Sequence, residues 1–207
     1  MSSTRGDRSD SSHPVRLNYR RTFLIGFGFF GISVMWTLYN DYIPIFLQAG
    51  NPLFTTSETV TRTVGFGLGA TCTGLIMTLD NLVALFLLPL IGIWSDRIWT
   101  PLGRRKPFIV ALAPIAIITF LFIPLIVRGI APELSGMTEA LGRPLMLFIA
   151  ALGLLITAMA GFRTPVVSLM PDLTPSPLRS HANGIINLMG GVGGVTIKLV
   201  GARLYNI

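Results

Sequence analysis

Four charged side chains lie inside long apolar stretches of the sequence, where a charge is unfavourable unless a partner or a function accounts for it. They are Asp41, Asp80, Arg163 and Lys198. A charge at the centre of a membrane-spanning helix costs about 2.5–3.5 kcal/mol on insertion scales, so it normally faces a partner or a water-filled cavity. Counting depth at about 1.5 Å per residue brings Asp80 within reach of Arg163. The same count places Asp41 and Lys198 together in the outer part of their helices, so two ion pairs are geometrically possible.

These four residues differ in how readily they escape the apolar region. Asp80 and Arg163 lie too deep to reach water easily, which favours a role facing a cavity. Asp41 lies in a polar stretch and fits the wet outer end of a helix equally well. Lys198 can extend its four-carbon stem towards the outer headgroups, which is the simpler explanation for it.

Five apolar stretches must position these side chains. Of the 207 residues, 51% are hydrophobic and 12% are charged, about half the charge of an ordinary soluble domain. About 20 apolar residues in a helix cross a bilayer core of about 30 Å, and lipid offers the backbone no hydrogen-bond partners, so the stretches must be helices. They run approximately over 22–47, 68–94, 108–127, 145–170 and 184–205. The sequence predicts an all-α integral membrane protein.

The distribution of positive charge predicts the orientation. The Ser- and Arg-rich segment 1–21 and the segments after the second and fourth stretches hold most of the Lys and Arg, whereas the alternate loops hold only Arg62, Arg128 and Arg143. Short loops rich in Lys and Arg stay cytoplasmic. We therefore expect a disordered cytoplasmic tail over 1–21 and a C-terminus on the outer side. The net charge of +7 then reflects topology and contact with membrane lipid, not nucleic acid.

Several chemical classes find no support in the sequence. With one cysteine, Cys72, and two distant histidines, neither a disulfide framework nor a Cys/His zinc site is expected. The sequence holds no nucleophile elbow, phosphate-binding loop or zinc-protease motif. We expect no enzyme activity, no metal and no cofactor.

A polar loop after the second stretch carries the most specific pattern. It reads Gly-x-x-x-Asp-Arg and then Gly-Arg-Arg-Lys, through Gly92, Asp96, Arg97, Gly103, Arg104 and Arg105. This loop resembles the one between helices two and three of the major facilitator superfamily, whose members are secondary transporters. The resemblance implies a gating loop, in which the acid at Asp96 helps to close the cytoplasmic side against the other half of the transporter.

A second stretch narrows the resemblance. An Arg in the fourth span is followed by an Asp-Leu pair, a polar turn with Arg, and an Ala-Asn that opens a Gly-rich span, at Arg163, Asp172, Arg179 and Asn183. This order is similar to the region of helices four and five in sucrose–proton symporters and the wider glycoside–pentoside–hexuronide group. The resemblance implies that Arg163 binds sugar. Asp172 matches the acid of the Asp-Leu pair, where fixing a loop is the simpler role.

Further site residues follow from depth. Trp36 and Tyr39 lie deep enough to stack on a sugar ring, although aromatic residues near span ends are more often interfacial anchors. For proton coupling, depth favours Asp80, with Asp41 as a second candidate and Asp172 as the family alternative. The glycines at 190–194 have the spacing that permits close helix contact.

The five spans would correspond to helices one to five in the N-terminal half of a major facilitator, whose complete members have two six-helix halves. The sequence is thus expected to be the start of a sugar–proton symporter that works by alternating access, completed by a second polypeptide or a longer natural chain. The alternative is a non-transporting scaffold or accessory subunit derived from a truncated transporter.

Overall fold

Five long helices make up most of the described chain. The computed structural model describes residues 17–54, 64–101, 103 and 105–205, apart from the side chains at 54, 80, 202, 204 and 205. The helices are α1 (Tyr19–Gln48), α3 (Ala70–Arg97), α4 (Lys106–Arg128), α5 (Gly142–Leu173) and α6 (Arg179–Tyr205). Each is long and apolar enough to cross a membrane. The predicted all-α fold with five spanning helices is confirmed.

Polar residues and turns move some helix ends away from the predicted positions. α1 begins at Tyr19, before the predicted 22, because the Asn18 Oδ1 accepts a hydrogen bond from the Arg21 N–H at 3.2 Å and so caps the first turn. Residues 19–21 therefore belong to the helix and not to the tail, whose first 16 residues lie outside the described part. α6 begins at Arg179, before the predicted 184, directly after the turn η3 (Ser176–Leu178).

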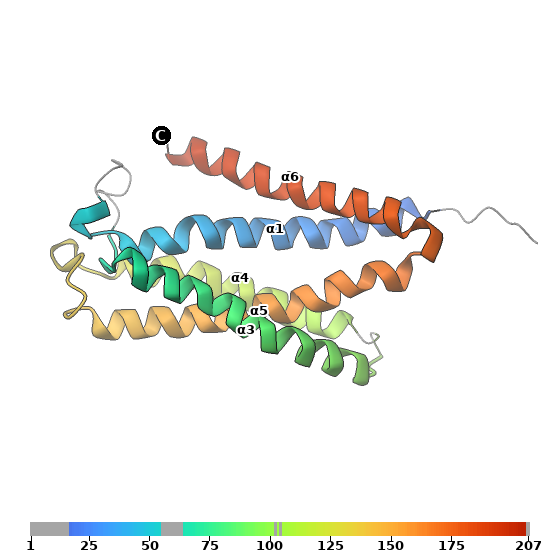
Figure 1. The fold of residues 1–207 in the computed structure, drawn as a ribbon, viewed down its shortest axis with the longest axis horizontal. Helices are drawn as coiled ribbons and strands as arrows, with labels where there is room; N and C mark the ends of the chain where they lie inside the picture. The colour runs from blue at the N-terminus through green and yellow to red at the C-terminus, as the bar shows by residue number, and fades with distance from the viewer. Residues whose placement is uncertain (1–16, 55–63, 102, 104, 206–207) are drawn as a thin grey trace, which may run out of the picture.

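The helices run side by side with alternating sense (Figure 1). α1 lies between α6 on one side and the group of α3, α4 and α5 on the other. One end of the bundle holds the α3–α4 and α5–α6 connections. The opposite end holds the α1–α3 connection and the α4–α5 connection with its turn η2 (Pro132–Leu134). All polar loops thus gather at the two ends, as a bilayer requires.

The core lies between α1, α4 and α5. Tyr39 and Ile43 of α1, Ile123 of α4, and Phe148 and Leu155 of α5 are almost completely buried. α5 is the most enclosed helix, with half of its apolar window inside the structure. Because lipid tails are as apolar as these side chains, close packing rather than exclusion of water holds such helices together.

Glycines bring α6 unusually close to α1. A Cβ added at Gly193 would lie 2.7 Å from the Phe30 carbonyl oxygen, and one added at Gly190 would lie 3.0 Å from Ser33 Oγ. Gly193 accepts no side chain unless the helices move apart, because the backbone carbonyl cannot give way, whereas a side chain at Gly190 needs the Ser33 hydroxyl to shift. The predicted packing role of these glycines is confirmed at both positions.

Three other glycines close the bundle at the end opposite to the α3–α4 connection. Gly50, Gly67 and Gly136 have φ of 88°, 67° and 85°, values that other residues adopt only with strain. A side chain at Gly136 would collide with the Gly50 carbonyl oxygen. Beside them, the ring of Phe66 packs edge-on against that of Phe148, with centroids 5.1 Å apart. This junction fastens the α1–α3 connection to the α4–α5 connection.

Candidate functional site

Arg163 and Trp36 meet on an open face between α5 and α1. The guanidinium carbon of Arg163 lies 5.8 Å from the centroid of the Trp36 ring, within the range of a cation–π interaction. The Arg163 side chain is exposed and Trp36 is half-buried. The structure thus brings together two residues that sequence reasoning named separately, and it leaves the donors of Arg163 accessible.

Tyr39 supports this pair from behind. Its ring packs edge-on against that of Trp36, with centroids 5.5 Å apart and planes at 82°. Tyr39 has no exposed surface, because it lies one turn from Trp36 on the side of α1 that faces the core. It therefore orients Trp36, whereas the surface that a ligand can meet here is that of Trp36 and Arg163.

The predicted pair of Asp41 and Lys198 is present between α1 and α6. Asp41 Oδ1 lies 3.6 Å from Lys198 Nζ, and their side chains are 42% and 63% exposed. Both residues lie inside their helices, and the lysine meets an acid of the neighbouring helix. The Asp80 side chain lies outside the described part, and its pairing with Arg163 stays a prediction.

A second cluster lies at the end of the bundle where α3 and α5 finish. Arg105 Nε donates to Asp172 Oδ2 at 2.6 Å, and an Arg105 terminal nitrogen lies 3.2 Å from Asp96 Oδ1. The Arg105 side chain is only 16% exposed. It therefore ties the end of α3, the start of α4 and the end of α5 into one charged cluster that includes Asp172.

The turn that delivers Arg105 depends on Gly103. Its φ is 99°, and its N–H donates to the Thr100 carbonyl at 2.8 Å while Thr100 Oγ1 donates back to the Gly103 carbonyl at 2.7 Å. Arg97 is exposed at the end of α3. Arg104 lies outside the described part, so its predicted role in the loop is untested.

The remaining predicted residues stabilise helix contacts and ends. A Cβ added at Gly92 of α3 would meet Thr164 of α5 at 3.8 Å. Arg179 donates to the carbonyl oxygens of Pro171 and Thr174 at 3.1 and 3.3 Å, and so satisfies groups that the end of α5 leaves open.

Sequence reasoning missed a polar partner of Asn183. Asn187 Nδ2 donates to Asn183 Oδ1 at 3.0 Å, and both side chains are exposed. The signal was present in the sequence, because two asparagines four residues apart share one face of a helix. Among the described residues, no three His, Cys, Asp or Glu side chains gather into a metal site.

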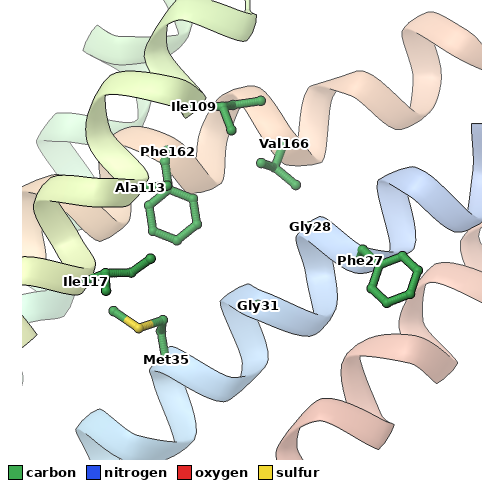
Figure 2. Close-up of a pocket in the computed structure, with 9 residues that line it drawn as sticks. All are labelled: Phe27, Gly28, Gly31, Met35, Ile109, Ala113, Ile117, Phe162 and Val166. Carbon is green, nitrogen blue, oxygen red and sulfur yellow. The ribbon is translucent and has the colours of Figure 1, made fainter.

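One groove within the bundle is lined only by apolar side chains and glycines (Figure 2). It has a volume of about 180 Å³ and lies between α1, α4 and α5, where Gly28 and Gly31 leave space. Phe162 and Met35 project into this space from α5 and α1. Without polar groups it offers nothing to hold a hydrophilic solute, so the Arg163 and Trp36 face remains the better candidate site.

Comparisons with known proteins agree with the sequence resemblance. The sequence profile of the Major Facilitator Superfamily matches residues 22–207. A human protein, proton-associated sugar transporter A, is 27% identical over 183 residues, which are 88% of this chain and 22% of that protein. The chain therefore spans about a fifth of the length of this relative. No solved structure matches it significantly.

Proposed function

The chain belongs to the major facilitator superfamily, a family of membrane transporters and not of enzymes, and on this premise we propose that it takes part in sugar–proton symport. It is a multi-pass integral membrane protein. The distant similarity to a proton-associated sugar transporter supports the substrate class. We further propose that the segment over 22–207 acts with a second transporter half, from another polypeptide or from further chain, by alternating access.

The observation that carries the proposal is the meeting of Arg163 with Trp36. A guanidinium presents several N–H donors in a fixed fork, which suits adjacent hydroxyl groups. An aromatic face beside it offers a flat apolar surface to the C–H side of a pyranose ring. Sugar sites need this combination of apolar contact and a few placed polar groups, and the exposed Arg163 over Trp36 supplies it.

Proton coupling is assigned to carboxylates within the spans. Asp80 is the first candidate because of its depth, and Asp41 is the second because it sits beside Lys198. A carboxylate that gains or loses a cationic partner between two access states takes up and releases a proton. Either residue would link proton movement to a change in helix contacts.

The charged cluster of Arg105, Asp96 and Asp172 is proposed as the cytoplasmic gate. Its bonds join the ends of three helices, and the positive charge of neighbouring loops favours the cytoplasmic side for this end. This assignment puts the N-terminus inside and the C-terminal end of α6 outside.

Uptake measurements test the proposal. The chain is purified from its native membrane with whatever remains bound to it and is placed in vesicles with an inward proton gradient. Radiolabelled sucrose, glucose and glucuronate are offered in turn. We expect uptake of one sugar that collapses when a protonophore removes the gradient. Arg163→Lys should reduce uptake at least about tenfold, since lysine keeps the charge and loses the fork.

Arg128→Lys is the matched control, because Arg128 is exposed at the far end of α4. If folded protein takes up none of the three sugars, the proposed sugar symport is wrong. If uptake occurs and Arg163→Lys leaves it unchanged, the assignment of Arg163 to the substrate is wrong.

A further inference from the structure

Asn40 is a polar side chain in the second half of α1 to which neither the motifs nor the proposed site gives a role. It lies eight residues before the end of this spanning helix at Gln48, or about 12 Å along the axis. Its side chain is exposed, and no group among the described residues hydrogen-bonds to its amide. An amide is unfavourable in hydrocarbon, and the short side chain of asparagine cannot extend to the helix end as a lysine can. We therefore expect Asn40 to meet water or a polar ligand.

Helical periodicity places Asn40 on the same side of α1 as Trp36. Successive residues of an α-helix turn by about 100°, so these two residues, four apart, differ by only about 40°. By the same count, Asp41 lies about 140° from Trp36. The contact with α6 passes between these directions at Thr37, whose hydroxyl would lie 3.3 Å from a Cβ added at Gly194. Asn40 and Asp41 thus leave α1 on opposite sides of α6, and Asn40 is on the side of Trp36.

Arg163 reaches Trp36 from the opposite direction along α1. A Cβ added at Gly28 would lie 2.8 Å from Val166 Cγ1, and α5 runs antiparallel to α1 (Figure 1). Arg163, three residues before Val166, therefore begins about five residues before Trp36 along α1, whereas Asn40 comes after Trp36. Each Cα–Cβ bond leans towards the N-terminus of its own helix. Because the two helices are antiparallel, the side chains of Arg163 and Asn40 lean towards each other.

Three groups thus form a column along α1: the guanidinium of Arg163, the indole of Trp36 and the amide of Asn40. The guanidinium carbon lies 5.8 Å from the centroid of the Trp36 ring. Asn40 follows Trp36 by about one helical turn, or about 6 Å. A six-membered sugar ring carries hydroxyl groups on opposite edges, so a ring beside Trp36 presents one edge to each polar group.

We propose that Asn40 is a substrate-binding residue, which contacts hydroxyl groups on the edge of the sugar that points away from Arg163. This inference rests on the proposed transport of sugar. Arginine only donates hydrogen bonds, whereas an amide both donates and accepts them, so a hydroxyl at Asn40 can also use its hydrogen. A polar group left without a partner disfavours an analogue that lacks the matching hydroxyl. Asn40 therefore selects among sugars by the hydroxyls of one edge, and Arg163 by those of the other.

Cysteine labelling tests whether Asn40 faces water, independently of transport. Cys72 is the only cysteine, so Cys72→Ser gives a background without thiols. Asn40→Cys should react with a membrane-impermeant thiosulfonate at least about tenfold faster than Leu38→Cys. Leu38 is the matched control because it lies at nearly the same depth on the opposite side of α1, where it lines an apolar groove of about 290 Å³. Equal reaction rates of the two variants would overturn the inference, whatever the protein transports.

Sugar titrations test the contact of the amide with the substrate. Trp94→Phe with Trp99→Phe leaves Trp36 as the single tryptophan of the three, and its fluorescence reports binding of sucrose, glucose and glucuronate. We expect Asn40→Ala to weaken binding about 5- to 20-fold. Asn187→Ala, which removes an exposed asparagine of α6 outside the proposed site, should leave binding unchanged. If circular dichroism shows that Asn40→Ala does not fold, Asn40→Leu, of similar size and apolar, takes its place.

Monodeoxy analogues of the sugar that binds test the assignment of the two edges. Asn40→Ala should lose the preference for the parent sugar over one analogue. Arg163→Lys should lose the preference over a different analogue, whose missing hydroxyl lies on the other edge. Unchanged sugar affinity in Asn40→Ala, or loss of the same preference in both variants, would contradict the inference while leaving sugar transport standing. Fast labelling of Asn40→Cys, with no response of the unsubstituted site to any sugar, would instead overturn the proposed function and the inference that rests on it.

Discussion

The close packing of α6 against α1 predicts that alanine is tolerated at Gly191 of α6 and not at Gly193. Gly193→Ala would place a methyl group 2.7 Å from the Phe30 carbonyl oxygen and 3.1 Å from its ring. An ordinary van der Waals contact needs about 3.4 Å or more, so α6 must move away from α1 by roughly half an ångström to one ångström. Such a gap removes about a quarter to a half of the attraction at each contact between the two helices. Gly191→Ala, on the same helix, meets nothing within 4 Å.

The two variants share the same gain in helix propensity, about 1 kcal/mol or less, so their difference isolates packing. Overpacking costs about 1–3 kcal/mol, and Gly193→Ala should be less stable than Gly191→Ala by that amount. Reversible unfolding by SDS in mixed micelles, followed by helical circular dichroism, measures both free energies. Equal stability of the two variants would refute the fixed seam between α1 and α6.

Two further predictions concern the ion pairs. Arg105→Gln leaves Asp96 and Asp172 of the end cluster without their shared partner. It should lower the free energy of unfolding by only about 1–2 kcal/mol, because both acids are partly exposed to solvent. Faster proteolysis of the α3–α4 connection is the expected result, and an unchanged cleavage rate would contradict the prediction. Asp41→Asn leaves Lys198 charged and unpaired in the apolar region, so it should reduce the yield of folded protein, and adding Lys198→Met should restore that yield. Failure of the second change to rescue the first would contradict the explanation that the unpaired charge of Lys198 causes the loss.

The sequence predicted the features that depend on depth alone. Apolar length determined the five spans, and counting 1.5 Å per residue paired Asp41 with Lys198 before the helices were placed, since straight, nearly parallel helices keep that count. Helix ends were less predictable because they depend on local polar contacts, such as the Asn18 cap at the start of α1.

Features that depend on helix rotation were beyond the sequence. Depth alone could not show that Arg163 meets the ring of Trp36, or that Tyr39 turns into the core, because both depend on how α1 and α5 rotate against each other. The contact of Gly50 with Gly136 joins two loops far apart in the chain. The sequence around neither glycine indicated which residue it would contact.

The packing contacts of α1 with α6 and with α5 differ in the kind of atom that limits them. Towards α6, the limiting contact is with the backbone carbonyl of Phe30, which cannot rotate away. Towards α5, the limiting contact is with the end of the Val166 side chain, which can adjust, and beyond it the contact of Trp36 with Arg163 is made by flexible groups. A substitution at Gly193 is therefore expected to disturb the packing of α1 more than one at Gly28, where the neighbouring side chain can adjust.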